Sequence, residues 1–247
     1  MGSMISRRKR GAAAKRSKEI DRQLRDEGIE QSKVINLLFF STDREWRLIA
    51  TDDVKGSPKV AFERMCNEDN RKRGGTLDEI DFVCKYLPFA IIDASGIRTK
   101  VSKWLHHFEH VNALIFSTDV SKYNEKFDAV HGKNHLREAL RLFDCMFNSP
   151  WLSEVSFILI TYNVDVFEEK LKSTPLTVCF PKYNGLNEVA EAVDYVHKQF
   201  EARNRSPKRE LYCHSHRQHL DETIWPFVFD CITDVIIANN LRGCGLY

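Results

Sequence analysis

The sequence predicts an α/β fold in which helices flank a mainly parallel β-sheet. Four short apolar runs have the length of strands, at 34–40, 89–93, 113–116 and 156–160. Two amphipathic segments predict helices, at 134–147 and 190–200. Strands that alternate with helices are typical of parallel sheets with right-handed crossovers. A hydrophobic content of 43% and a charged content of 29% over 247 residues fit a globular chain that can bury a core.

Residues 1–30 predict a separate basic arm, helical over about 7–29. The net charge of +2 hides a run of basic residues before the first acidic residue: Arg7, Arg8, Lys9, Arg10, Lys15, Arg16 and Lys18. A helix that is polar nearly all round protrudes or docks on a partner. The charge allows contact with anionic lipid or nucleic acid, or simple solvation.

The first six residues fit the M-G-x-x-x-[ST] pattern for myristoylation at Gly2. One acyl chain holds a protein at a membrane only marginally, so stable anchoring needs a second signal. The basic arm would supply that signal, at roughly 1 kcal/mol per basic residue near an anionic surface.

The strand at 34–40 is followed by Ser41, Thr42 and Asp43, with no phosphate-binding loop after it. Such a loop needs G-x-x-x-x-G-K-[ST], and no window of the chain satisfies this pattern. The charged segment 42–88 predicts no regular element and is expected to be a connection. The tetrapeptide at 40–43, Phe-Ser-Thr-Asp, recurs at 116–119, which is too short to establish a repeat.

The C-terminal part predicts a last strand at 210–213 and a final helix. Apolar residues at helical spacing give this helix one buried stripe: Ile224, Phe227, Val228, Cys231, Ile232, Val235 and Ile236. Gly243 takes the position of its C-cap. Between strand and helix, the spacing of Cys213, His214, His216 and His219 allows either a zinc site or a solvent-facing polar loop.

Seven widely spaced cysteines, an odd number, predict a reducing compartment rather than a disulfide framework. No stretch approaches the ~18 apolar residues that a membrane span needs.

Four segments carry a resemblance to one known family. The string at 236–247, IIANNLRGCGLY, resembles the receptor-reading C-terminus of heterotrimeric G-protein α subunits of the inhibitory/"other" class. The segment at 103–109, KWLHHFE, is similar to that family's K-W-I-H-C-F-E, and 93–98, DASGIR, to its second switch, D-V-G-G-Q-R. The string at 15–21 is similar to its N-terminal helix. The resemblance implies a Ras-like domain over 31–247, in which 42–88 replaces the phosphate-loop helix, the helical insert domain and the first switch.

The resemblance also implies a nucleotide site with GTP or GDP and Mg²⁺ as cofactors. Asp93 would hold the Mg²⁺ shell, Gly96 would sense the γ-phosphate, and Asp165 would accept hydrogen bonds from guanine. An alternative for Asp93 is a strand-end aspartate that caps a turn. Ile97 stands at the position of the catalytic glutamine, and its alkyl side chain cannot orient a water. Tyr162 and Asn163 replace the asparagine and lysine of the guanine-reading motif.

The partners implied by the resemblance are a βγ dimer and a G-protein-coupled receptor. The βγ surface would use Arg98, Lys103, Trp104 and Phe108. For Trp104 and Phe108 the alternative is core packing of an amphipathic helix. The receptor surface would use the tail residues Leu241, Gly243, Cys244, Gly245, Leu246 and Tyr247. An anionic membrane at the cytoplasmic face of the plasma membrane, and not nucleic acid, would be the partner of the basic arm.

Three hypotheses for function follow. The first is a membrane-associated α-subunit-like transducer whose GTP/GDP cycle is weakened or lost. The second is a non-enzymatic decoy or scaffold that occupies receptors or βγ without nucleotide. The third is a truncated or misjoined gene product whose sheet is left partly uncovered.

Overall fold

The computed structural model describes residues 34–43, 46–52, 58–64, 78–84, 87–95, 108, 111–127, 132–206 and 209–243. The predictions for the N-terminal arm with Gly2, for Gly96, Ile97, Arg98, Lys103 and Trp104, and for tail residues 244–247 lie outside the described residues. Side chains are described for part of these ranges only, and in the final helix they are described up to Asp234.

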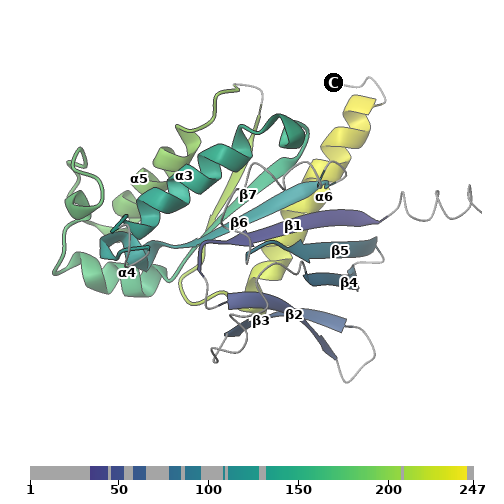
Figure 1. Cartoon of the computed structure of the whole chain (residues 1–247), viewed down its shortest axis with the longest axis horizontal. Helices are drawn as coiled ribbons and strands as arrows, with labels where there is room; N and C mark the ends of the chain where they lie inside the picture. The colour runs from purple at the N-terminus through teal and green to yellow at the C-terminus, as the bar shows by residue number, and fades with distance from the viewer. Residues whose placement is uncertain are drawn as a thin grey trace, which may run out of the picture.

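The main sheet has six strands in the order β4-β5-β1-β6-β7-β8 (Figure 1). Their bounds are β1 Ile35–Ser41, β4 Asp78–Cys84, β5 Leu87–Asp93, β6 Ala113–Asp119, β7 Ser156–Tyr162 and β8 Leu211–Ser215. All neighbouring pairs are parallel except β4 and β5, which are antiparallel. The predicted mainly parallel α/β sheet is therefore confirmed.

Helices cover both faces of this sheet. Their bounds are α3 His135–Phe147, α4 Val164–Leu171, α5 Val189–Glu201 and α6 Trp225–Gly243, with short 3₁₀ turns η3 Val120–Asn124, η4 Pro150–Leu152, η5 Leu176–Val178 and η6 Glu222–Ile224. Side chains from α3, α4 and α5 pack in one core cluster, and those of α6 pack in a second one. The final helix runs through Gly243 instead of ending before it. Among the described helices, none has both the length and the apolar character that crossing a bilayer requires.

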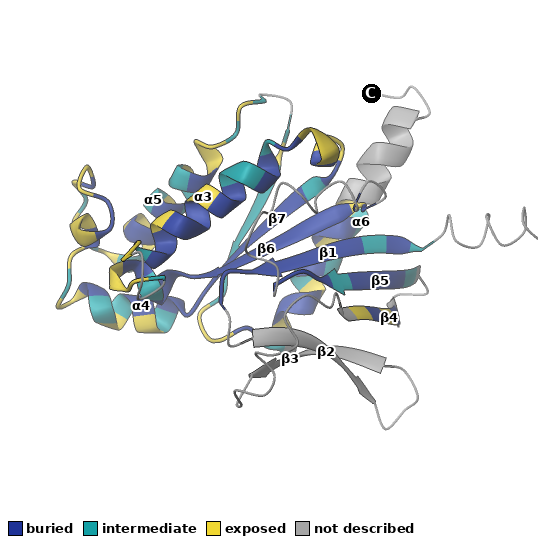
Figure 2. Cartoon of the chain, viewed as in Figure 1, coloured by how far each residue is buried: buried dark blue, intermediate teal, exposed yellow. Residues whose placement is uncertain are grey.

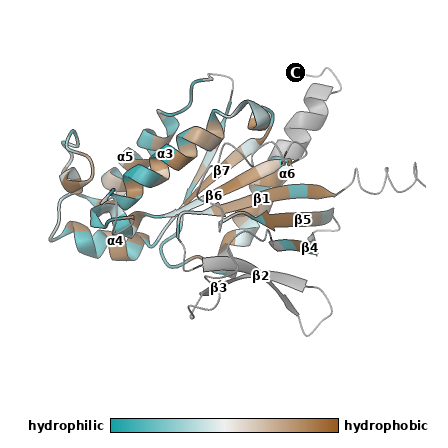
Figure 3. Cartoon of the chain, in the orientation of Figure 1, coloured by the Kyte–Doolittle hydropathy of each residue, from teal (hydrophilic) through white to brown (hydrophobic). Residues whose placement is uncertain are grey.

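The central strand β1 shows how its sequence builds both clusters. Leu38 and Phe40 point to the α3 side, whereas Leu37 and Phe39 point to the α6 side, because successive strand residues alternate between faces. All four are fully buried. β1 and β6 are dark blue along most of their length in Figure 2, and the central strands are mainly brown in Figure 3. A strand covered on both faces reads as a continuous apolar run, which is why 34–40 was predictable.

The segment 42–88, for which the sequence predicted no element, contains strands. β2 Trp46–Asp52 and β3 Pro58–Arg64 pair as a separate antiparallel two-stranded sheet, and β4 adds an edge to the main sheet. In β4, Ile80 and Phe82 are buried, whereas Glu79 and Asp81 are exposed. This period-2 alternation is typical of an antiparallel edge strand. The sequence did not predict β4 because its charged residues resemble those of the rest of segment 42–88.

The aromatic contacts of Phe143 generate a prediction for core stability. Phe143 is fully buried, and its ring centroid lies 5.3 Å from that of Phe116 and 5.1 Å from that of Phe200. We expect Phe143→Ala to lower the free energy of unfolding by about 3–5 kcal/mol, because it removes buried area and leaves a cavity. Urea unfolding followed by circular dichroism measures this loss. Val178→Ala is the control, since Val178 is 54% exposed. Equal midpoints for the two variants would contradict the prediction.

Candidate functional site

The two Phe-Ser-Thr-Asp tetrapeptides lie side by side at the carboxyl edge of the sheet. Phe40 pairs with Phe116 in the β1–β6 register, and their rings stack with centroids 5.5 Å apart. At the next step of the edge, Thr42 Oγ1 donates to Thr118 Oγ1 at 2.9 Å. The recurrence in the sequence thus marks adjacent strands that deliver Asp43 and Asp119 to the same end of the sheet.

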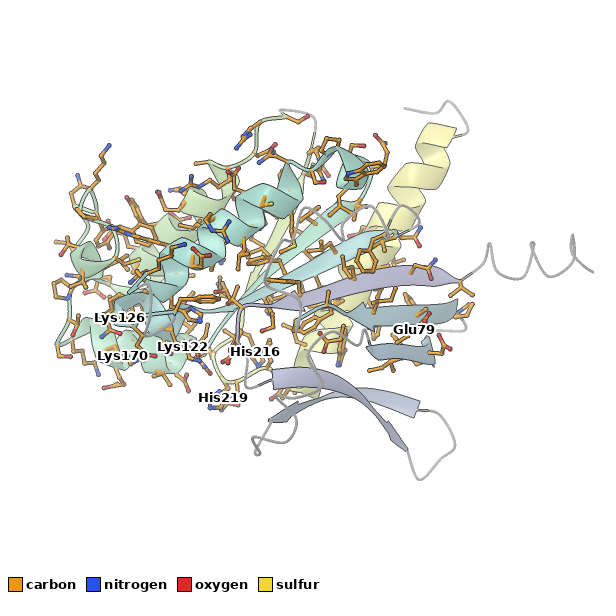
Figure 4. All side chains as sticks on the ribbon, in the orientation of Figure 1. Glu79, Lys122, Lys126, Lys170, His216 and His219 are labelled. Carbon is orange, nitrogen blue, oxygen red and sulfur yellow. The ribbon has the colours of Figure 1, made fainter. Side chains whose placement is uncertain are left out.

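Asp43 is buried directly after β1 and is held by two donors. Its Oδ2 accepts from Lys122 Nζ at 2.9 Å and from the Tyr162 hydroxyl at 3.2 Å. Lys122 comes from η3 after β6, and it lies at this end of the sheet in Figure 4. Burial, followed by the charges of Asp43 and Asp119, raises the pKa of Tyr162 well above its ordinary value. Tyr162 therefore remains a neutral donor.

Asp119 is the centre of a second cluster of buried hydrogen bonds, beside that of Asp43. Its Oδ1 accepts from the amide and the hydroxyl of Ser121 at 2.9 and 2.7 Å, which caps η3. Its Oδ2 accepts from Asn163 Nδ2 at 2.7 Å. Burial raises the pKa of Asp119, although the hydrogen bonds and Lys122 act in the opposite direction. Asn163 has a φ of +59°, a left-handed conformation that asparagine tolerates better than most residues.

The loop after β8 is fastened to the start of α4 by backbone hydrogen bonds. The amides of Asn163 and Asp165 donate to the carbonyls of Gln218 and Arg217, both at 2.9 Å. Arg217 Nη2 also lies 3.2 Å from Glu168 Oε2. These contacts tie β7, α4 and the β8–α6 loop into one unit.

The structure places Asp93 at the end of β5 and Asp165 near the start of α4. Asp93 Oδ1 accepts from the Ser95 amide at 2.8 Å, which matches the turn-capping alternative, and Asp165 Oδ1 accepts from the Val166 amide at 2.7 Å. Strands β1 and β6 lie between β5, which ends at Asp93, and β7, which precedes α4. A Mg²⁺ role for Asp93 and a guanine role for Asp165 stay predictions.

Phe108 was predicted as a partner-facing anchor, with core packing as the alternative. The structure buries it to 4% exposure within the larger core cluster. This burial fits the core alternative, and a role of Phe108 in a βγ surface stays a prediction.

The end of β1 leaves no room for a phosphate loop and its helix. β1 ends at Ser41 and β2 begins at Trp46, so four residues separate the two strands. A phosphate-binding loop presents backbone N–H groups and cations to its anion. The described residues at this edge include the buried carboxylates of Asp43 and Asp119 instead.

His214 of β8 and His216 of the loop after it lie close to side chains outside the predicted cluster. The His214 ring stacks on Phe227 with centroids 4.1 Å apart, and His216 Nε2 lies 3.6 Å from Asp221 Oδ1. In the described part of the chain, no three His, Cys, Asp or Glu side chains gather as a metal site would require. The zinc alternative gains no support from this geometry.

Sequence reasoning missed Asp43, Asp119 and Lys122 as members of one network. The repeated tetrapeptide was the available signal, because equal tetrapeptides at the ends of two parallel strands meet when the strands are adjacent and in register. No sequence pattern pointed to Lys122, since its contact with Asp43 depends on the path of η3.

Comparison with known proteins agrees with this architecture. Residues 69–236 match the family model described as G-protein alpha subunit. The chain belongs to the G-protein α-subunit family. It is 46% identical over 215 residues to a guanine nucleotide-binding protein G(o) subunit alpha of Caenorhabditis elegans, covering 84% of this chain and 60% of that protein. It is also 46% identical over 169 residues to the corresponding protein of Locusta migratoria, covering 68% and 48%. The chain thus spans about half the length of such α-subunit relatives.

The Asp43–Lys122 pair generates a prediction for this α-subunit-family chain. We expect Asp43→Ala to lower the free energy of unfolding by about 3–5 kcal/mol, because it leaves a largely buried ammonium without its carboxylate. In a double-mutant cycle with Lys122→Ala, the coupling energy should exceed about 1.5 kcal/mol. The exposed Lys172–Glu169 pair, 2.6 Å apart, is the control and should show little coupling. Additive losses for Asp43 and Lys122 would contradict the prediction.

His197 generates a prediction for pH dependence. Its Nε2 lies 2.9 Å from Thr161 Oγ1 of β7 and 3.4 Å from Ser215 Oγ at the end of β8. Burial lowers the pKa of His197, so the unfolded chain binds more protons between that lowered value and about 6.5. Stability should therefore fall as the pH drops through this window, and His197→Gln should reduce the slope. Unfolding at several pH values measures it, with exposed His219→Gln as the control. An unchanged slope in His197→Gln would be the contrary result.

Proposed function

We propose that this chain acts in a receptor-coupled G-protein pathway as an α-subunit-like transducer in which guanine nucleotide binding and GTP hydrolysis are weakened or lost. The observation that carries the proposal is the buried Asp43 carboxylate at the end of β1, where family members would present a phosphate loop. Lys122, a cation that reaches this edge, is already paired with Asp43 at 2.9 Å.

Electrostatics gives the physical reason. A nucleotide triphosphate needs several cationic or N–H donors aimed at its oxygens. Here Asp43 is 3% exposed and Asp119 is 2% exposed, so both carboxylates lie in a poorly solvated region where repulsion of an anion is weakly screened. Ile97, in place of the catalytic glutamine, adds a chemical reason for lost hydrolysis.

A second candidate function is a decoy or scaffold that occupies βγ or a receptor without nucleotide. The β8–α6 loop favours the scaffold function, because backbone hydrogen bonds to the start of α4 hold this loop without a ligand. The βγ surface would include Arg98, Lys103, Trp104 and Phe108, and the receptor surface Leu241, Gly243, Cys244, Gly245, Leu246 and Tyr247. Myristate on Gly2 and the basic arm would hold the chain at the cytoplasmic face of the plasma membrane.

Calorimetry with GDP and with a GTP analogue, in Mg²⁺, tests the loss of nucleotide binding. The purified chain should give no binding in the submicromolar range, because the phosphate donors are replaced by carboxylates. The C. elegans relative, named as a guanine nucleotide-binding protein, is the positive control. Submicromolar, Mg²⁺-dependent binding by this chain would refute the proposal.

A partner assay on the same samples separates the two candidate functions. Immobilised βγ should retain the chain with or without nucleotide, and Trp104→Ala should weaken retention, whereas Trp151→Ala, at an exposed tryptophan of η4, should not. A peptide of residues 236–247 should compete with an intact α subunit at a coupled receptor. Receptor-stimulated release of the chain from βγ supports a transducer, and stable co-occupancy supports a scaffold.

A further inference from the structure

An open pocket of about 390 Å³ lies on the helical face of the sheet, away from the network at the end of β1. α3 and α5 run side by side there (Figure 1), and the segment after η5 closes one side. Arg137 comes from α3, Phe180 and Lys182 from that segment, Tyr195 from α5, and Arg203 from just beyond it. The volume falls within the range of small-molecule sites, roughly 300–1,000 Å³.

The charges around this pocket are of one sign. Arg137, Lys182 and Arg203 line it, and none of its described lining residues is acidic. Other cations nearby have carboxylate partners: Arg141 with Glu138 at 2.7 Å, Lys198 with Asp194 at 2.6 Å, and Arg205 with Asp144 at 2.9 Å. Across the residues that the structure describes, the three lining cations form no ion pair. The pocket therefore concentrates positive charge that the described residues do not neutralise.

Arg137 is positioned before any ligand arrives. Its Nε donates to the Cys179 carbonyl at 2.7 Å, which orients the planar guanidinium. An oriented guanidinium can offer its remaining N–H groups to two oxygens of one anion. Arginine is the residue best suited to bidentate contact with a phosphate or carboxylate, and two arginines with a lysine match a dianion better than a monoanion.

One wall of the pocket is aromatic. Phe180 and Tyr195 meet edge to face with centroids 5.5 Å apart, and Tyr195 also contacts Tyr183 at 4.9 Å. Phe180 is buried and Tyr195 is half-buried, so these rings are held by packing. A rigid aromatic wall beside a cationic rim suits a ligand with a flat ring and an anionic group.

We propose that this pocket binds a small organic phosphate, a monoester whose dianionic group contacts Arg137, Lys182 and Arg203 and whose ring packs against Tyr195 and Phe180. The site is separate from the carboxyl edge, so its ligand binds whether or not the chain binds guanine nucleotide. Binding is reversible and involves no bond formation.

Titration of the full chain with phenyl phosphate, followed by NMR or calorimetry, tests the proposal. We expect a Kd near or below about 1 mM, equivalent to roughly −4 kcal/mol. Arg137→Gln and Arg203→Gln should each weaken binding about tenfold, and Lys182→Gln less, because lysine lacks the bidentate fork. Arg141→Gln is the matched control, since it neutralises a paired arginine on the same helix. Circular dichroism establishes that each variant is folded.

Two further experiments test the contributions of the aromatic ring and of the phosphate group separately. Tyr195→Leu should weaken phenyl phosphate but leave inorganic phosphate unchanged, and phenol should not bind measurably. The proposal fails if phenyl phosphate does not bind, or if Arg137→Gln and Lys182→Gln bind it as the wild type does. Equal affinity for phenyl phosphate and inorganic phosphate would overturn the aromatic part.

Discussion

The buried contact between Asp43 and Lys122 is the constraint on which the carboxyl edge depends. A carboxylate that is 3% exposed must be compensated by close donors, because its transfer from water without them costs several kcal/mol. The donors come from η3 and from Tyr162 at the end of β7, so compensation requires the ends of β1, β6 and β7 to keep one arrangement. Asp119 extends this requirement through Asn163 to the start of α4. The carboxyl edge is thus a buried polar network. It is built from the strand ends where a parallel sheet could otherwise bind a ligand.

Much of the fold was predictable because the central strands are covered on both faces. Burial on both faces produces apolar runs, and the runs at 34–40, 89–93, 113–116 and 156–160 correspond to β1, β5, β6 and β7. The edge strand β4 escaped prediction because half of its side chains face solvent and carry charge. The hairpin of β2 and β3 escaped because it lies outside the main sheet, where no apolar run marks a strand.

The site was less predictable than the fold, since its members are distant in sequence. Tyr162 and Asp43 are 119 positions apart, and only the strand order makes them neighbours. The family resemblance directed attention to Asp93 at the end of β5 and Asp165 near the start of α4, and neither belongs to this network. Phe108 illustrates a different limit: an aromatic residue in an amphipathic segment fits a partner surface and a core equally well in sequence, and packing decides between them.

The same network bears on how α6 can communicate with the sheet. Trp225, Val228 and Ile232 of α6 are buried against it, and carbonyls of the loop that precedes this helix accept hydrogen bonds from the amides of Asn163 and Asp165. A force applied beyond Gly243 would therefore act first on apolar contacts and then on bonds between protein backbone groups. Breaking such bonds exposes backbone polar groups at a cost in free energy. The hydrogen bonds of the β7–α4–β8 unit would thus resist a displacement of α6 relative to the sheet.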